Sequence, residues 1–155
     1  MRRGLAAGIA AALVVVLAGC GGGGRLSKSD YEQKLQAEGR TLKSAFQGID
    51  VSNTGNLRDI GAKIGQLQAQ LESAAREIDD LKPPKDAEVD NAKIAKALHK
   101  FADEFGKMKK AAQSGDPTQM QQIEREITNA PEVKEAVAAT RDLQKKGYKV
   151  GSLGQ

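Results

Sequence analysis

A regular apolar stripe between residues 57 and 81 restricts the possible folds of this chain more than any other part of its sequence. Its members alternate strictly between spacings of three and four and are Leu57, Ile60, Ile64, Leu67, Leu71, Ala74, Ile78 and Leu81. This spacing keeps all of them on one side of an α-helix, so it predicts a long amphipathic helix with a heptad-like seam. Pro83-Pro84 cannot continue a helix and therefore indicates its end.

Two glycines, Gly61 and Gly65, lie on the flank of this stripe near the start of the expected helix. Each weakens a helix by about 1 kcal/mol relative to alanine, so they predict a frayed beginning. The alternative is that Gly61-x-x-x-Gly65 lets a neighbouring helix approach closely, although the argument for that motif comes from lipid-embedded helices.

Other parts of the chain repeat the helical pattern. Ser27 and Asp30 resemble a capping box that starts a first helix, which we expect to end near Gln47 with Tyr31, Leu35, Leu42, Phe46 and Ile49 on its apolar face. A third helix is predicted over about 86–114, with the apolar positions Ile94, Leu98, Phe101, Phe105, Met108 and Ala112. A last one starts at Asp116-Pro117, is kinked or split at Pro131 and ends near Gly147, with the inward positions Met120, Ile123, Ile127, Val133, Val137, Thr140 and Leu143.

These patterns predict an all-α protein. Segment 48–55 has the composition of a turn, and no stretch alternates long enough to form a strand. Helices with one apolar stripe and short connections pack antiparallel to their sequence neighbours. We therefore expect an antiparallel up-and-down four-helix bundle over residues 29–150, followed by a flexible tail over 151–155.

The first 19 residues have the features of a bacterial signal peptide. Met1-Arg2-Arg3 is a short cationic segment, and the apolar or small run that follows extends from Leu5 to Ala18. This run is too short to cross a hydrocarbon core, which needs about 20 apolar residues. Arg2-Arg3 leaves a twin-arginine route open, but general secretion fits the next residues better.

Leu17-Ala18-Gly19-Cys20 has the pattern of a lipobox, in which an aliphatic residue and two small residues precede a cysteine. The thiol of Cys20 would take up the lipid, because a thiolate is the nucleophile that this step requires, and cleavage would fall between Gly19 and Cys20. Residues 20–28, which include four consecutive glycines, would form a short flexible tether. The pattern therefore predicts a protein held by a lipid at the extracytoplasmic face of the bacterial cell membrane.

Three short motifs resemble those of small all-helical secreted lipoproteins of high-GC Gram-positive bacteria. The matching segments are Leu26-Ser27-Lys28-Ser29-Asp30-Tyr31, Leu81-Lys82-Pro83-Pro84 and Gly147-Tyr148-Lys149-Val150-Gly151. Many members of that group have one cysteine in the first helix and another in the tail, near the positions of Gln36 and the Val150-Gly151 junction here. The resemblance implies a lipid-anchored helical domain without known catalytic activity. The missing pair predicts a looser C-terminal tail, because a disulfide typically contributes about 2–4 kcal/mol.

Composition argues against several classes of function. The 24 basic residues include Arg2 and Arg3, so a chain cut before Cys20 keeps 22 basic against 20 acidic residues, which is no signature of nucleic-acid binding. One cysteine and one histidine rule out an internal disulfide, a cysteine-rich zinc site and a two-histidine metal site. We therefore expect no metal and no cofactor. The few aromatic residues are needed for the core, so stacking platforms for sugars or bases are not expected.

Individual candidates for chemistry have simple structural explanations. His99 is expected to pair with Asp103 four residues on, as a half-exposed histidine rather than a metal or acid–base site. Asp79-Asp80 and Asp103-Glu104 are expected on solvated faces, and Met108 and Met120 are expected to fill the core rather than bind haem. The basic clusters Lys107, Lys109, Lys110 and Lys145, Lys146, Lys149 are expected to be solvated charges rather than contacts to lipid head groups.

The expected function is therefore binding without catalysis. The chain is predicted to be a membrane-anchored helical module that interacts with an envelope protein. The alternative is a small-ligand carrier or an accessory subunit of a transporter. An internal pocket of a few hundred cubic ångströms would favour the carrier, whereas a solid core with an exposed apolar groove would favour the interaction module.

Overall fold

The computed structural model describes residues 24–48 and 56–151. This part of the chain is helical and contains no strand, which confirms the all-α prediction for these residues. Its elements are α1 (Lys28–Gln47), α2 (Leu57–Asp79), the 3₁₀ helix η2 (Lys85–Ala87), α3 (Glu88–Ser114), α4 (Pro117–Asn129) and α5 (Pro131–Lys145). None of these helices combines the length and the apolarity that crossing a bilayer requires.

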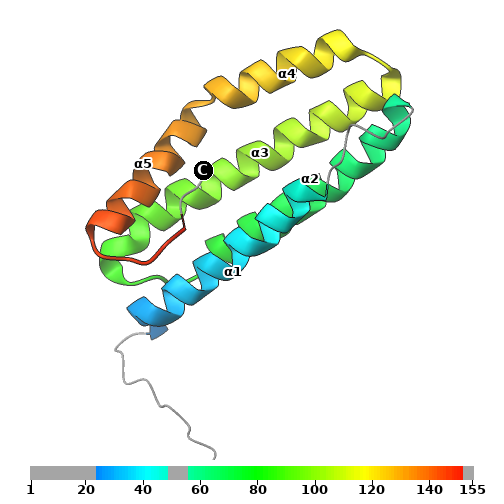
Figure 1. The fold of residues 1–155 in the computed structure, drawn as a ribbon. Helices are drawn as coiled ribbons and strands as arrows, with labels where there is room; N and C mark the ends of the chain where they lie inside the picture. Colours follow the sequence, from blue (N-terminus) through cyan, green and yellow to red (C-terminus); the bar gives the residue numbers. More distant parts are fainter. Residues whose placement is uncertain (1–23, 49–55, 152–155) are drawn as a thin grey trace, which may run out of the picture.

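The helices form an elongated bundle around a central antiparallel pair, α2 and α3 (Figure 1). Helix α1 packs along α2, whereas α4 and α5 follow one another along α3. Consecutive long helices therefore run up and down, and α4 with α5 takes the place of a single fourth helix. The first turn of α1, the α2–α3 connection and the end of α5 all lie at one end of the bundle (Figure 1).

Side-chain caps fix three helix starts. Ser27 Oγ accepts a hydrogen bond from the Asp30 N–H at 3.1 Å, and Asn56 Oδ1 accepts one from the Asp59 N–H at 2.9 Å. Asp116 Oδ1 accepts from the Gln119 N–H at 2.9 Å, with Pro117 as the first helical residue of α4. Such caps satisfy backbone donors that have no partner inside the helix. The starts that Ser27 and Asp116 predicted are thus confirmed.

The α2–α3 contact is closer than the sequence suggested. A Cβ atom at Gly61 would lie 3.4 Å from the Ala112 Cβ and 3.3 Å from the Gln113 Cγ, and one at Gly65 would meet the Lys109 side chain at 3.2 Å. Helix α2 begins at Leu57, ahead of both glycines. The prediction of a frayed start is therefore wrong. The two glycines lie where α3 passes α2. A larger residue at Gly61 would press on Ala112 and Gln113, whereas one at Gly65 would displace the flexible end of the Lys109 side chain.

The core lies between α2 and α3 and follows the predicted stripe. Its α2 members Ile64, Leu67, Leu71, Ala74 and Ile78 are buried, as are Ile94, Leu98 and Ala112 of α3. Helix α5 packs against the core mainly through small residues. Its buried positions are Ala136, Ala139, Thr140 and Leu143. Val133 and Val137 are half-buried. Half-buried positions also include Phe101, Phe105, Met108, Met120 and Ile127.

Helix α1 departs most from its predicted apolar face. Tyr31 and Leu42 are buried and Leu35 is half-buried, but Phe46 is 45% exposed. The Phe46 ring touches Phe105 of α3 edge to face, with 5.9 Å between the ring centroids, so only one side of it is covered. Ile49 lies outside the described residues, as does most of the predicted turn over 48–55. The burial of α1 therefore decreases toward its C-terminal end.

The break at Pro131 is a complete split. Helix α4 ends at Asn129 and α5 begins at Pro131, with Ala130 at φ −57° and ψ 129° between them. A residue before proline is pushed out of the helical region by steric contact with the proline ring, which accounts for this conformation. The split lets the last segment change direction, so that α5 follows the lower part of α3 (Figure 1).

Candidate functional site

The lipobox residues Leu17, Ala18, Gly19 and Cys20 lie outside the described residues. The part of the chain that follows them is fixed to the bundle almost at once. The Leu26 N–H donates to the Lys82 carbonyl at 2.7 Å, and Arg25 donates to the Pro83 carbonyl at 3.0 Å and to Glu88 at 3.1 Å. The segment next to the predicted lipid site is therefore held against the α2–α3 connection.

The C-terminal tail is docked at the same end. Gly147 has φ +78°, a conformation that glycine adopts readily and that turns the chain back after α5. This turn buries Tyr148, which is 3% exposed and donates its hydroxyl to Asp86 Oδ1 at 2.7 Å. The Tyr148 ring meets Tyr31 edge to face at 5.8 Å between centroids, and the Lys28 ammonium lies 4.5 Å from its centre.

Backbone groups of the tail are also bonded. The Lys149 N–H donates to Glu32 Oε1 at 3.0 Å, and the Gln36 amide donates to the Lys149 carbonyl. Lys146 Nζ donates to Asp90 Oδ2 at 2.6 Å. Burial of one aromatic ring and a set of hydrogen bonds therefore connect the tail, up to Val150, to α1, η2 and α3. That it is looser than a tail held by a disulfide stays a prediction.

We call this group of contacts the terminal clasp. It consists of Arg25, Lys28, Tyr31, Glu32, Gln36, Asp86, Asp90, Asn91, Lys146, Tyr148 and Lys149. Burial raises the pKa of both tyrosine hydroxyls, and the nearby carboxylates of Asp90 and Asp86 raise it further. Both hydroxyls therefore stay protonated near neutral pH and can donate, Tyr31 to Asn91 and Tyr148 to Asp86.

The single histidine has a different partner from the one expected. His99 Nε2 lies 2.7 Å from Asp79 Oδ2 at the end of α2, and both side chains are about half exposed. The predicted pairing with Asp103 is wrong, because α2 packs beside α3 and brings Asp79 to the histidine. In the described part of the chain, no three acidic, histidine or cysteine side chains gather in a way that could hold a metal ion.

Glu104 was expected on a solvated face, and this prediction is also wrong. Its side chain is 1% exposed, and its Oε1 accepts from Lys100 Nζ at 2.7 Å and from Lys107 Nζ at 2.9 Å. Burial favours the neutral acid, but the two lysines outweigh that effect and lower the pKa of Glu104 below its ordinary value. Its Oε2 has no hydrogen-bond partner among the described residues.

The two basic clusters are partly neutralised. Lys107 pairs with Glu104, Lys145 lies 3.3 Å from Asp142 and Lys146 pairs with Asp90. Lys109 packs its alkyl chain where Gly65 leaves space. Three of the six lysines therefore pair with carboxylates within the protein, which reduces the positive charge of each cluster.

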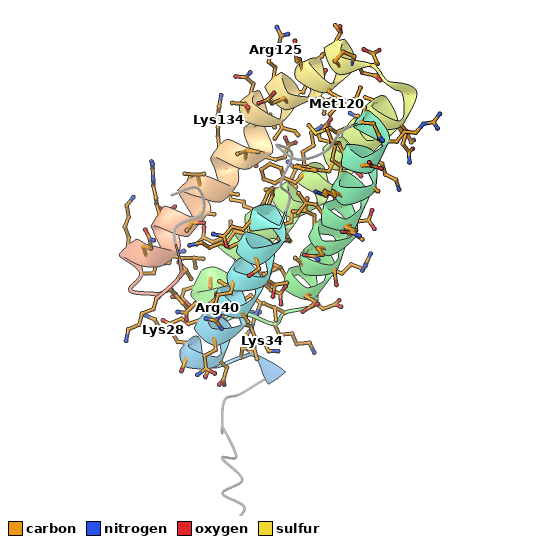
Figure 2. The ribbon with its side chains drawn as sticks, turned by 45° about the vertical axis from the view of Figure 1, so that its right-hand side comes forward. Lys28, Lys34, Arg40, Met120, Arg125 and Lys134 are labelled. Atoms are coloured by element: carbon orange, nitrogen blue, oxygen red, sulfur yellow. The ribbon has the colours of Figure 1, made fainter. Side chains whose placement is uncertain are left out.

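A cleft that the sequence analysis did not foresee separates the second half of α1 from the first half of α2. It has a volume of about 570 Å³ and is lined by Arg40, Thr41, Ser44, Ala45, Gly48, Lys63, Gln66, Leu67 and Gln70. Figure 2 shows Arg40 on the same helix as Lys34, which lies nearer the clasp. Segments 40–48 and 63–70, which line the cleft, contain no acidic residue. This feature of the sequence can be recognised as significant only when the two helices are known to be adjacent.

An internal pocket would favour the carrier and an exposed apolar groove would favour the interaction module. The described part of the chain shows neither feature in full. The cleft opens on the surface, whereas the carrier hypothesis predicted an internal pocket. Phe46 and Val89 are the exposed large apolar side chains of the described part, and they lie on different helices. Comparisons of the chain with protein-family models, with curated proteins and with solved structures find no match.

Proposed function

We propose that this chain is a bacterial lipoprotein, anchored through a lipid on Cys20 at the extracytoplasmic face of the cell membrane. Its helical domain would be a non-enzymatic module that binds an envelope protein. The observation that carries the proposal is the order of the chain, in which a signal-like segment and a lipobox directly precede a folded helical domain. Only seven residues separate Cys20 from Lys28, the first residue of α1.

The clasp sets the distance between the domain and the membrane. Because Arg25 and Leu26 are bound to the α2–α3 connection, only Gly21 to Gly24 would separate the lipid on Cys20 from the first residues that contact the bundle. A flexible glycine chain of this length reaches about 11 Å on average. The clasp end would then face the membrane closely, and the opposite end of the bundle would point into the envelope.

Binding rather than catalysis is supported by the character of the polar groups. His99 is the only histidine of the sequence, and its neighbour is an exposed aspartate rather than a nucleophile. The buried Glu104 is held by two lysines on its own helix. A lipid anchor increases the effective concentration of a weak binding module near membrane partners, which suits such a domain.

The alternative function is a small-ligand carrier or an accessory subunit of a transporter. The cleft between α1 and α2 favours this alternative, because its volume of about 570 Å³ lies within the usual range for small-molecule sites. A carrier of this kind would be compatible with the same lipid anchor.

The anchor can be tested by metabolic labelling with palmitate. We expect the wild-type chain to incorporate label and Cys20→Ser to lose it. A matched control, the double variant Cys20→Ser with Ser29→Cys, keeps one cysteine near the membrane but outside the lipobox, and should also remain unlabelled. Equal labelling of Cys20→Ser and wild type would contradict the proposal.

The binding role can be tested by proximity crosslinking of the lipidated protein in its own cells, followed by mass spectrometry. A reproducible envelope protein should be captured by the wild type and by His99→Ala, and far less by the unanchored Cys20→Ser. If His99→Ala stays folded and anchored but loses cellular function, the non-enzymatic interpretation fails.

A further inference from the structure

Helix α4 is attached to the rest of the bundle by apolar contacts alone. Ile123 is its one buried side chain, Met120 and Ile127 are half-buried, and its other residues are exposed. These three apolar residues recur at spacings of three and four, so they form a single narrow stripe along the helix. Within the described part of the chain, the hydrogen bonds of residues 117–129 all stay inside segment 116–130, and no ion pair joins α4 to another element.

Helix α5, the next element of the chain, is attached differently. Lys96 of α3 lies 3.7 Å from Glu132 and 3.8 Å from Glu135, which both belong to α5. Just beyond the end of α5, Lys146 pairs with Asp90 at 2.6 Å. Four residues of α5 are buried, compared with one of α4. Polar contacts therefore hold α5 on α3, whereas α4 has none of this kind.

Both ends of α4 have a backbone conformation that interrupts the helix. Gly115, which ends α3, has φ +73°, and Ala130, which precedes α5, has φ −57° and ψ 129°. A few residues at the end of an element commonly absorb the backbone rotation when that element moves. Helix α4 can therefore move at these two residues while the hydrogen bonds inside α3 and α5 stay intact.

The side of α3 that α4 and α5 cover contains a buried carboxylate. Ala97, Glu104 and Ala111 follow one another at intervals of seven residues, so they share one side of α3, and all three are buried. The opposite side of α3 packs on α2, where Gly106 lies against Gln68. The helices that follow α3 on its other side are α4 and α5 (Figure 1).

The ion pairs of α5 indicate which of these residues each helix covers. Lys96 pairs with Glu132 in the first turn of α5, so the adjacent Ala97 lies beneath α5. Ala111 lies about 21 Å further along α3, where α4 runs beside it (Figure 1). Glu104 lies midway between these two alanines, beneath the end of α4 that precedes Pro131.

Neither covering helix supplies a bond to Glu104. Its Oε1 accepts from Lys100 and Lys107, both on α3, and its Oε2 has no hydrogen-bond partner among the described residues. A carboxylate that is shielded from water without gaining a partner opposes the arrangement that buries it. The position of α4 on α3 is therefore stabilised by three apolar side chains and opposed by one buried charge.

We propose that α4 is a hinged lid, which opens at Gly115 and Ala130 while the rest of the bundle stays folded. Glu104 sets the balance between the closed and open positions, because opening lets water reach its Oε2. Opening also exposes the part of α3 between Glu104 and Ala111. This device does not depend on lipidation of Cys20 or on the proposed protein partner.

The test is thiol labelling of buried positions in the full chain, purified from membranes in detergent. Ala111→Cys places a thiol beneath α4, and Ala97→Cys, the matched control, places one on the same side of α3 beneath α5. The probe is iodoacetamide, and mass spectrometry of peptides separates its label from any on Cys20. Each rate is divided by the rate of the same variant in urea. The thiol of Ala111→Cys should react at least about tenfold faster than that of Ala97→Cys.

The role of the carboxylate is tested in the Ala111→Cys chain. Adding Glu104→Met removes the charge but keeps a side chain of similar length, and should slow labelling at least about fivefold. Asp103→Met, the same change at the adjacent exposed position, should alter the rate less than about twofold. Ile123→Ala weakens the stripe of α4 and should accelerate labelling at least about fivefold, without accelerating that of Ala97→Cys.

A measurement on the wild type covers the case in which a cysteine variant does not fold. A detached helix of 13 residues is unstable in water, so the amides of residues 120–129 should exchange hydrogen at least about tenfold faster than those of residues 136–143. Equal exchange of the two segments, or equal labelling of folded Ala111→Cys and Ala97→Cys, would overturn the lid. Unchanged labelling after Glu104→Met would overturn the role of the carboxylate, and acceleration of both thiols by Ile123→Ala would show unfolding of the whole bundle instead.

Discussion

The two ends of the bundle are constructed differently. At the clasp end, residues from the start of α1, the α2–α3 connection and the C-terminal tail are bound to one another by hydrogen bonds, an ion pair and a buried aromatic pair. In the second half of α1, Phe46 is 45% exposed and an open cleft separates the helix from α2.

This difference suggests how anchoring and binding are divided. The clasp joins segments up to 118 residues apart in sequence, as the hydrogen bond from Lys28 to the Lys146 carbonyl illustrates. Such contacts fix the start of α1, the end of the domain to which the proposed tether would be attached. Each half of α1 has one buried side chain, Tyr31 or Leu42, but the half beyond the clasp has fewer half-buried ones, which leaves polar and aromatic groups available to other molecules.

The largest expected effect comes from breaking the core that both ends share. Leu71 is 1% exposed in the middle of α2, and Leu71→Asp places a charge without a partner in an apolar environment. We expect this variant to lose its cooperative thermal transition in circular dichroism. Gln70→Asp, at the next and exposed position, should melt within a few degrees of the wild type. Similar melting temperatures of the two variants would contradict the assignment of Leu71 to the buried stripe of α2.

A smaller effect separates the two ends. Tyr148→Ala removes a buried ring and its hydrogen bond to Asp86, and should lower the free energy of unfolding by about 3 kcal/mol. Phe46→Ala removes a ring of which almost half is exposed, so about 1 kcal/mol is expected. Urea unfolding measures both values. If Phe46→Ala lowers the free energy of unfolding as much as Tyr148→Ala does, the two ends are equally well packed and the comparison fails.

The smallest effect is a dependence of α1 docking on pH. Burial raises the pKa of Glu38, and a hydrogen bond shared with Glu77 and the charge of Glu77 raise it further. A raised carboxyl pKa means that this pair stabilises the fold in acid and loses that contribution as pH rises through the pKa of Glu38. Glu38→Gln should therefore gain less than about 0.5 kcal/mol at pH 7, because the pair is largely exposed, and the gain should shrink toward pH 4.

Melting temperatures of Glu38→Gln and wild type across this pH range provide the measurement. Glu124→Gln, an exposed change on α4, is the control and should show no such trend. A gain from Glu38→Gln that stays constant from pH 7 to pH 4 would show that the two carboxyls do not interact.

The periodic features of the sequence predicted the helices well. The stripe of α2, the caps Ser27 and Asp116 and the break at Pro131 act over one to three helical turns, so the local sequence contains the information. The stripe is buried because helix geometry places its residues on one side, and the helix breaks at Pro131 because proline restricts the backbone of the residue before it.

Features that depend on two distant segments were not predicted. The partner of His99 is Asp79, twenty residues away, and burial of Glu104 depends on how the helices pack around α3. The cleft arises only when Arg40 of α1 and Lys63 of α2 face the same space. No periodicity within one helix reports such a pairing, so the clasp, the cleft and the buried carboxylate required the three-dimensional arrangement.

The central claim, that the bundle is firmly closed at the clasp and loosely held beyond it on α1, is tested most directly by hydrogen exchange. The full chain, purified from membranes in detergent, is exchanged and analysed by mass spectrometry of its peptides. Amides in residues 29–36 and 143–150 should exchange at least about tenfold more slowly than those in residues 40–47. Equal protection of the two parts of α1, or faster exchange at the clasp, would contradict the account.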